Sequence, residues 1–231
     1  MAAMNEQLQL RKKAIAGAAR APLLLAALIF APAWSVAYWQ GWLYWAVSCA
    51  GVWALTFYLL HHDPDLMKRR MKAGPLAERR PRQKLIQSVT SIFLAAIYIV
   101  PGIDHHQGWS QVPWPVVVIG ELLVVLGFII VFWTFRENSF ASSIVEVTQG
   151  QRVVSTGPYA RVRHPMYSGA LLIFFGTPVA LGSWWGLIPA VGLVGALVWR
   201  LRDEEHVLAD ELAGYRNYQD AVRARLVPGL Y

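Results

Sequence analysis

Two long apolar runs constrain this chain more than any other feature. Residues 41–60 read GWLYWAVSCAGVWALTFYLL, and residues 113–135 read PWPVVVIGELLVVLGFIIVFWTF, with Glu121 as the one charged residue in the two runs. A helix needs about 20 apolar residues to cross the hydrocarbon core of a bilayer. Helices and closed barrels are the structures that satisfy their own backbone hydrogen bonds in lipid. Runs of this length therefore predict transmembrane helices.

The composition agrees with a membrane-embedded chain. Of 231 residues, 56% are hydrophobic and 15% are charged, whereas a soluble domain carries about 25% charged residues. This balance excludes a disordered chain and an ordinary soluble enzyme, and a single cysteine excludes a disulfide framework. We predict an all-α, polytopic membrane bundle with a cytoplasmic amphipathic C-terminal helix. Its six spans cover about 21–39, 41–60, 85–103, 113–135, 165–181 and 184–200.

Two features leave the number of spans open. The last two spans form a short hairpin, and Thr177-Pro178 permits a kinked or re-entrant helix there. The first span contains Ala31-Pro32-Ala33 after its apolar run, a small-residue pattern that also occurs at signal-peptide cleavage sites. We favour a retained first span because the basic region before it is long. Five spans are the alternative if the first span or the last hairpin is atypical.

The lysines and arginines predict the orientation of the bundle. All 21 lie in four segments: the N-terminal arm, residues 61–84, residues 136–164 and the tail after residue 199. Positive residues stay on the cytoplasmic side, so we expect both termini in the cytosol, and a bacterial inner membrane as the location. The net charge of +7 then reflects orientation and not nucleic-acid binding. The 61–84 loop is expected to be an ordinary cytoplasmic loop, with binding of anionic lipid headgroups as the alternative.

The other ionisable residues of the apolar part give no clear site. Glu121 lies inside a span, where a charged carboxylate is costly, so we expect it protonated and hydrogen-bonded to Ser88, Ser91 or a helix backbone. The pairs at 61–62 and 105–106 are adjacent histidines, which point to different helix faces and lack a matching ligand frame. We therefore predict interfacial histidines and no metal site.

The polar residues that could perform chemistry gather in two basic segments. In the first, His164 precedes Pro165, a residue suited to the first turn of a helix, and Tyr167 and Ser168 follow on that turn. The free N–H groups of a first turn can seat a carboxylate or phosphate; the alternative is an ordinary helix start at a membrane interface. In the second segment, Arg200 and Glu204 are four residues apart and share one helix face. They form either a ligand-binding pair or a simple salt bridge.

These residues also carry a family resemblance. The run QRVVSTGPYARVRHPMYSG, followed by an apolar hairpin, R-x-x-x-E-E and Y-x-x-Y, resembles the isoprenylcysteine carboxyl methyltransferase family. Phospholipid methyltransferases belong to the same superfamily. The resemblance covers about residues 136–231, which would form the methyltransferase core, while residues 1–135 would supply transmembrane helices and a basic loop.

The resemblance implies methyl transfer from S-adenosyl-L-methionine to a lipophilic or small-molecule acceptor at the cytoplasmic face. It implies that Arg200 binds an acceptor carboxylate and that Arg200, His164 and Glu204 form the catalytic group. The cofactor-binding residues implied by it are Glu146, Gln151, Arg152, Val153, Val154, Tyr159, His164, Pro165, Met166, Tyr167 and Glu204.

Several functions fit this frame. The first expectation is a protein-S-isoprenylcysteine carboxyl O-methyltransferase-like enzyme, because an ionised carboxylate acceptor needs no general base. A phospholipid, amine or small-thiol methyltransferase is the nearest alternative, and there His164 or Glu204 would accept a proton. An NADPH-dependent sterol-reductase-like enzyme and a non-catalytic membrane scaffold are further alternatives. The expected partners are the acceptor and membrane lipids, and the oligomeric state stays open.

Overall fold

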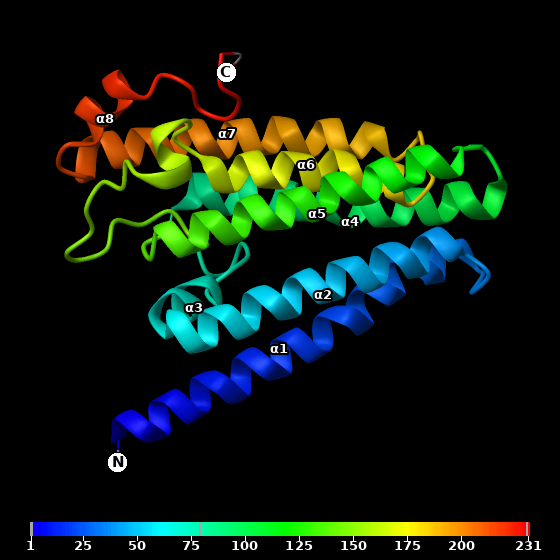
Figure 1. The fold of residues 1–231 in the computed structure, drawn as a ribbon, viewed down its shortest axis with the longest axis horizontal. Coiled ribbons are helices and arrows are strands. Elements are labelled where there is room, and N and C mark those ends of the chain that lie inside the picture. The colour runs from blue at the N-terminus through cyan, green and yellow to red at the C-terminus, as the bar shows by residue number, and fades with distance from the viewer. Residues whose placement is uncertain (1, 79, 230) are drawn as a thin grey trace.

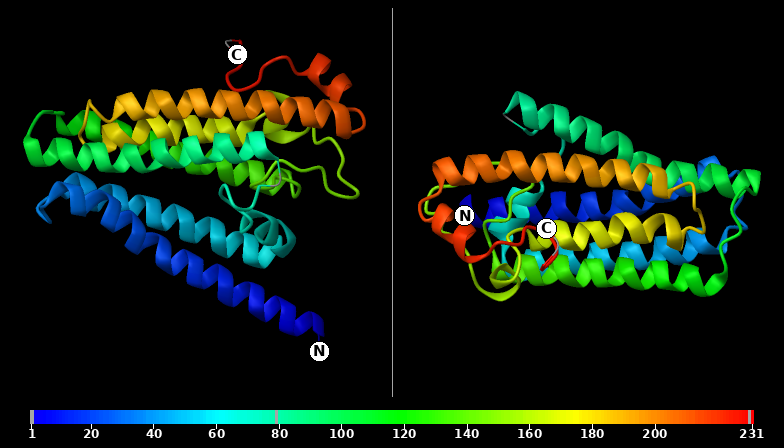
Figure 2. Two further views of the ribbon diagram at one scale, coloured as in Figure 1. Left: turned by 180° about the vertical axis from the view of Figure 1, so that it is seen from behind. Right: turned by 90° about the horizontal axis from the view of Figure 1, so that it is seen from above.

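The computed structural model describes residues 2–78, 80–229 and 231, which form helices joined by irregular segments (Figures 1 and 2). The long helices alternate in direction, as apolar spans with short connections must. The α-helices are α1 (Ala2–Ala33), α2 (Trp39–His62), α3 (Pro64–Arg70), α4 (Pro81–Gln107), α5 (Trp114–Glu137), α6 (Pro165–Ala180), α7 (Leu187–Glu211) and α8 (Tyr215–Ala221), with a 3₁₀ turn, η1, at Gly157–Ala160.

The predicted class, a helical membrane bundle, is confirmed, but the six spans are not equivalent. Within the described residues, four helices are long and apolar enough to cross a bilayer: Met4–Ala33, Trp39–His62, Pro81–Gln107 and Trp114–Glu137. The helix α6 has only 16 residues, and at 1.5 Å per residue it spans about 24 Å. It is one continuous helix through Pro178, so the re-entrant alternative at this position is wrong.

The short α6 lies at the centre of the bundle. It packs against α2, α4, α5 and α7, and Figure 2 shows it among these longer helices when the bundle is viewed from above. Its buried residues include Gly169, Gly176 and Thr177. The longer helices around α6 shield it from water, so α6 can be shorter than the hydrocarbon core is thick.

Glycines bring α5 and α6 into backbone contact. A Cβ at Gly127 would lie 2.7 Å from the carbonyl oxygen of Gly169, and one at Gly176 would lie 2.8 Å from that of Gly120. Small residues at such positions let transmembrane helices approach closely. The backbone of α6 at Gly169 therefore lies directly against α5.

Replacing Gly127 by leucine should force these two helices apart. Overpacking at a contact of this kind costs about 1–3 kcal/mol, so the thermal unfolding temperature in detergent should fall clearly. Gly195→Leu is the matched control, because a Cβ at Gly195 meets nothing within 4 Å. Equal unfolding temperatures for the two variants would show that the α5–α6 contact is not tightly packed.

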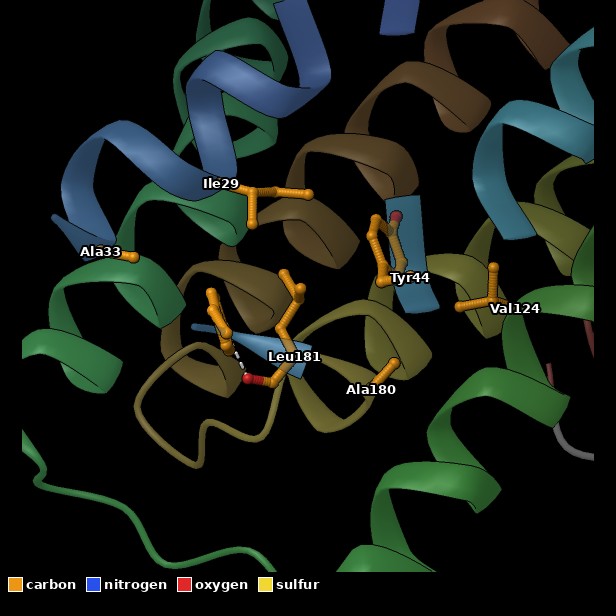
Figure 3. Packing of buried hydrophobic residues seen from close by; sticks show 7 residues of the cluster. Ile29, Ala33, Tyr44, Val124, Ala180 and Leu181 are labelled. Carbon is orange, nitrogen blue, oxygen red and sulfur yellow. Dashed lines mark hydrogen bonds between the residues drawn. The ribbon is translucent and has the colours of Figure 1, made fainter. Parts of the chain in front are cut away.

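One end of the bundle contains the connections without lysine or arginine. Figure 1 shows the α1–α2, α4–α5 and α6–α7 connections together at its right-hand end, opposite α3 and α8. The buried residues Ile29, Tyr44 and Val124, from three helices, pack there with Leu181 (Figure 3). At the same end, Asp104 accepts hydrogen bonds from Ser110 Oγ at 2.6 Å and from Ser183 Oγ, and so links the α4–α5 and α6–α7 connections. We call the opposite end, which holds the basic segments, the basic end.

Two predicted boundaries are wrong, and the predicted basic loop contains a short helix. The first helix ends at Ala33 and not at residue 39, because Trp34 adopts a positive φ of 49° and residues 34–38 form the turn. The basic 61–84 loop contains α3, whose first turn is capped by Asp63, which accepts a hydrogen bond from the Leu66 N–H. The predicted C-terminal helix is broken at Gly214, where φ is 81°, so that α8 is separate from α7.

Candidate functional site

A cavity opens at the basic end, between α6, the last turns of α7, α8 and the segment that joins α5 to α6. We call residues 138–164 of that segment the connecting segment. The cavity contains about 780 Å³ of space, including its open mouth. Its lining includes every predicted cofactor-binding residue except Pro165, which begins α6 on the side of a neighbouring groove. The structure thus brings together residues 146–167 and Glu204, which lie far apart in the sequence.

Tyr167 connects the two predicted polar residues of α7. Its hydroxyl donates to Glu204 Oε2 at 2.5 Å and accepts from Arg200 Nε at 3.0 Å. Arg200 and Glu204 are therefore joined through a phenol, and the direct salt bridge that their spacing allows is not formed. Glu204 lines the cavity, whereas Arg200 lies behind Tyr167 and outside the lining.

Arg200 is held in place by several elements at once. Its Nη1 donates to Glu78 Oε1 at 3.2 Å and to Gln83 Oε1 at 3.3 Å, and its Nη2 donates to the carbonyl oxygen of Ser143 at 2.8 Å. The Glu78 side chain is only 1% exposed. The charge of Arg200 thus balances a buried carboxylate from the α3–α4 loop, a role that its position in the sequence does not reveal.

Glu205 organises the start of α6, and sequence reasoning missed it. Its Oε1 accepts from Arg163 Nε at 2.6 Å and lies 3.2 Å from His164 Nε2, while its Oε2 accepts from Arg225 Nε at 2.9 Å. Burial favours the protonated acid, but these three hydrogen bonds outweigh it and hold the pKa of the Glu205 carboxyl well below its ordinary value. The adjacent acids Glu204-Glu205 were the available signal, and the second one fixes the imidazole of His164.

Carbonyl oxygens of the C-terminal segment accept hydrogen bonds from groups at the beginning of α6. The backbone N–H groups of Arg163 and His164 donate to the carbonyl oxygens of Ala224 and Arg225, each at 3.0 Å. Ser168 Oγ donates to the carbonyl oxygen of Leu226 at 2.6 Å. These groups hold the tail in place, so the helix start offers a ligand fewer donors than its sequence indicates.

Tyrosines from α8 form the outer wall of the cavity. Tyr218 donates to the carbonyl oxygen of Tyr159 at 2.7 Å, and Asn138 Nδ2 donates to the Tyr159 hydroxyl at 2.9 Å. Burial raises the pKa of Tyr218 to about 12, so this phenol is neutral at physiological pH. The Tyr215 hydroxyl is buried and has no hydrogen-bond partner within the described residues. A polar ligand in the cavity would satisfy it.

The remaining sequence candidates lie outside this cavity. Both carboxyl oxygens of Glu121 are buried without a partner among the residues described, and Ser88 and Ser91 donate to carbonyls of their own helix. The predicted hydrogen bond of Glu121 is therefore wrong. His61 and His62 contact carbonyls one turn back in α2. In the part of the chain that the structure describes, no group of three or more metal-ligating side chains is present.

Comparison with known proteins agrees with this geometry. Residues 115–213 match the family model of the phospholipid methyltransferases, a match that runs from the start of α5 to just beyond α7 and includes most of the cavity. No curated protein matches the chain. The match begins before the predicted core boundary at residue 136 and leaves out α8 and the tail. Over residues 115–213, somewhat less than half of the chain, the protein is similar to the phospholipid methyltransferases.

Proposed function

We propose that this protein is a membrane methyltransferase that uses S-adenosyl-L-methionine to methylate a lipophilic acceptor, with protein-S-isoprenylcysteine carboxyl O-methylation as the reaction it most resembles. The observation that carries the proposal is the cavity itself. Its lining combines Glu146 and Glu204 with Tyr159, His164 and Tyr167, within or beside the segment that matches the family.

The cavity has the groups that this cofactor requires. Glu204 and Glu146 are carboxylates suited to an ammonium group or ribose hydroxyls, and the unpartnered Tyr215 hydroxyl offers a further hydrogen bond. Val153 and Leu208 provide apolar surface for the adenine ring of the cofactor. When bound, the cofactor supplies an electrophilic methyl group on a sulfonium sulfur. The protein then has to align acceptor and methyl group and exclude water, and alignment can supply much of the rate.

The nature of the acceptor decides which side chains take part. An ionised carboxylate has no proton to lose, so Arg200 would hold it and no general base is needed. The family model favours a second candidate, a phospholipid amine, which must lose a proton during the reaction. His164, oriented by Glu205 at 3.2 Å, is then the proton acceptor that we propose.

We also propose that the basic end faces the cytosol of a bacterial inner membrane. The three connections that lack lysine and arginine lie together at the other end (Figure 1). The positive-inside rule then places the cavity and both termini on the cytoplasmic side. The cofactor, a charged molecule made in the cytosol, would reach the cavity from this side.

Binding of S-adenosyl-L-methionine to the purified protein tests the proposal directly. Wild-type protein should bind it and not NADPH, and Glu204→Ala should weaken binding about 10- to 100-fold, since a hydrogen bond to a charged group contributes about 1.5–3 kcal/mol. Asp210→Ala is the control, because the Asp210 side chain is 71% exposed and pairs with Arg216. Binding of NADPH alone, or of neither molecule, would contradict the proposal.

Transfer of a radiolabelled methyl group identifies the acceptor and the side of the membrane. The acceptors to compare are N-acetyl-S-farnesylcysteine, phosphatidylethanolamine and a small alkyl thiol. With the cofactor added from outside, inverted membrane vesicles should incorporate label and right-side-out vesicles should not. Labelling only in right-side-out vesicles would reverse the proposed orientation.

A further inference from the structure

Arg70 brings a second arginine to the site from a part of the chain outside the family match. It is the last residue of α3, and its Nη1 lies 3.3 Å from the Sδ of Met166 and 3.3 Å from the carbonyl oxygen of Ser142. Both Met166 and Ser142 line the cavity. The guanidinium also lies over the Phe135 ring, 4.8 Å from its centroid.

The positive charge of Arg70 is half-buried and forms no ion pair among the residues described. Among the described residues, no carboxylate lies within 4.0 Å of its guanidinium. The nearby acids are engaged elsewhere, Glu78 with Arg200 and Glu204 with the Tyr167 hydroxyl. Burial lowers the pKa of the Arg70 guanidinium, and the charge of Arg200 acts in the same direction. A half-buried cation that forms no ion pair favours an anionic partner.

Arg70 and Arg200 bind neighbouring carbonyl groups of the connecting segment. Arg70 Nη1 donates to the carbonyl oxygen of Ser142, and Arg200 Nη2 donates to that of Ser143, at 2.8 Å. The two guanidinium groups thus contact consecutive peptide units, and both lie just outside the cavity lining, behind Ser142, Met166 and Tyr167. A carboxylate or phosphate would bind such a pair more strongly than neutral carbonyls do, because charge-assisted hydrogen bonds are roughly twice as strong.

We infer that Arg70 and Arg200 together bind the anionic group of the methyl acceptor, a carboxylate or a phosphate, and that this group displaces the Ser142 and Ser143 carbonyls from the two side chains. The inference rests on the proposed function and adds a substrate-binding residue to it. It also explains how an arginine already held by the connecting segment becomes available to the acceptor. The acceptor is selected by its charge, and α3 contributes to that selection.

Binding of paired acidic and neutral probes to Arg70→Gln tests this. The first pair is N-acetyl-S-farnesylcysteine and its methyl ester; the second is phosphatidylethanolamine and a diacylglycerol with the same chains. Arg70→Gln should weaken binding of the acidic member of one pair about 10- to 100-fold. Binding of the neutral member and of S-adenosyl-L-methionine should stay within about twofold. The pair that responds tells whether the group is a carboxylate or a phosphate.

Arg69→Gln is the matched control. Arg69 is the preceding residue of α3 and donates to the Ser139 carbonyl of the same segment, so a purely structural effect through that segment would appear in both variants. Arg70→Lys should recover part of the preference for the acid, because it keeps the charge but loses the planar fork. A steady-state assay should show the Arg70→Gln defect in KM more than in kcat.

Several results would overturn the inference. Equal weakening of acidic and neutral probes by Arg70→Gln would reduce Arg70 to a structural residue, and so would equal effects of Arg69→Gln. No effect of Arg70→Gln on either pair, or no binding of either acid by wild-type protein, would also overturn it. If the protein bound no S-adenosyl-L-methionine yet kept the Arg70-dependent preference for acids, the proposed function would fail while the anion site stood.

Discussion

Replacing Glu205 by alanine is expected to destabilise the protein by about 3–5 kcal/mol, the cost of removing one partner from a buried ion pair. The Arg163 side chain is 5% exposed and would lose its carboxylate partner, and Arg225 and His164 would lose the same partner. The start of α6 and the tail would loosen together, since both are attached through these residues. Thermal unfolding in detergent, followed by circular dichroism, measures the loss.

The control for this prediction is Glu211→Ala on the same helix. Glu211 pairs with Arg80 at 2.6 Å, but the two side chains are 46% and 41% exposed, so the loss there should stay below about 1 kcal/mol. Similar losses for the two variants would mean that the Glu205 cluster is solvated and contributes little.

The depressed pKa of Glu205 also predicts a dependence of stability on pH. A carboxyl whose pKa is lower in the folded state stabilises that state at pH values above its ordinary pKa of about 4.5, and this contribution is lost as the pH falls toward the folded value. The difference in unfolding free energy between wild type and Glu205→Gln should therefore be largest near neutral pH and shrink below about pH 4.5. A difference that grows on acidification would contradict the assigned ion pairs.

Replacing Arg200 by alanine is expected to lower methyl transfer to a carboxylate acceptor by about 30-fold or more. Removing one partner of a buried charged pair costs about 2–5 kcal/mol, and tenfold in rate corresponds to about 1.4 kcal/mol. Binding of S-adenosyl-L-methionine should change only slightly, because Arg200 lies behind Tyr167 and outside the cavity lining. Single-turnover transfer of a labelled methyl group measures the effect.

The Arg200 variant needs a control for stability, because it leaves the Glu78 carboxylate buried and without its cation. The double variant Arg200→Ala/Glu78→Ala removes both charges and should recover a large part of any lost stability. It should not recover activity toward the carboxylate. Restored activity in the double variant would show that Arg200 acts only by supporting the fold, and unchanged activity in the single variant would exclude a carboxylate held by Arg200.

Much of the fold was predictable because it depends on local pattern. A long apolar run must become a helix in lipid, so the positions of α2, α4 and α5 follow from composition. The boundaries that are wrong depend on single backbone conformations, the positive φ at Trp34 and Gly214. These angles result from how the chain turns between packed helices, and periodicity does not contain that information.

The candidate site was predictable where its residues are neighbours in the chain. Residues 151–154, Tyr159 and the turn at His164 belong to one short segment, and Glu204 follows in a recognisable pattern, so a motif can gather them. Glu205 stands beside Glu204 in that pattern, but its role does not follow from it, and Arg70 and Glu78 carry no such pattern. Arg70 and Glu78 reach the site from the α3–α4 region: Arg70 is 72 positions from its partner Ser142, and Glu78 is 122 positions from its partner Arg200.

The local chemistry of the sequence accounts for the membrane helices, for the uneven distribution of positive charge and for a polar cavity at the basic end. These follow from the transfer of apolar and charged groups between water and lipid, which depends on each residue's own side chain. The tertiary packing determines which acid pairs with which arginine. The energy of a buried charge depends on the nearest opposite charge in space, and helices from both halves of the chain decide which charge that is.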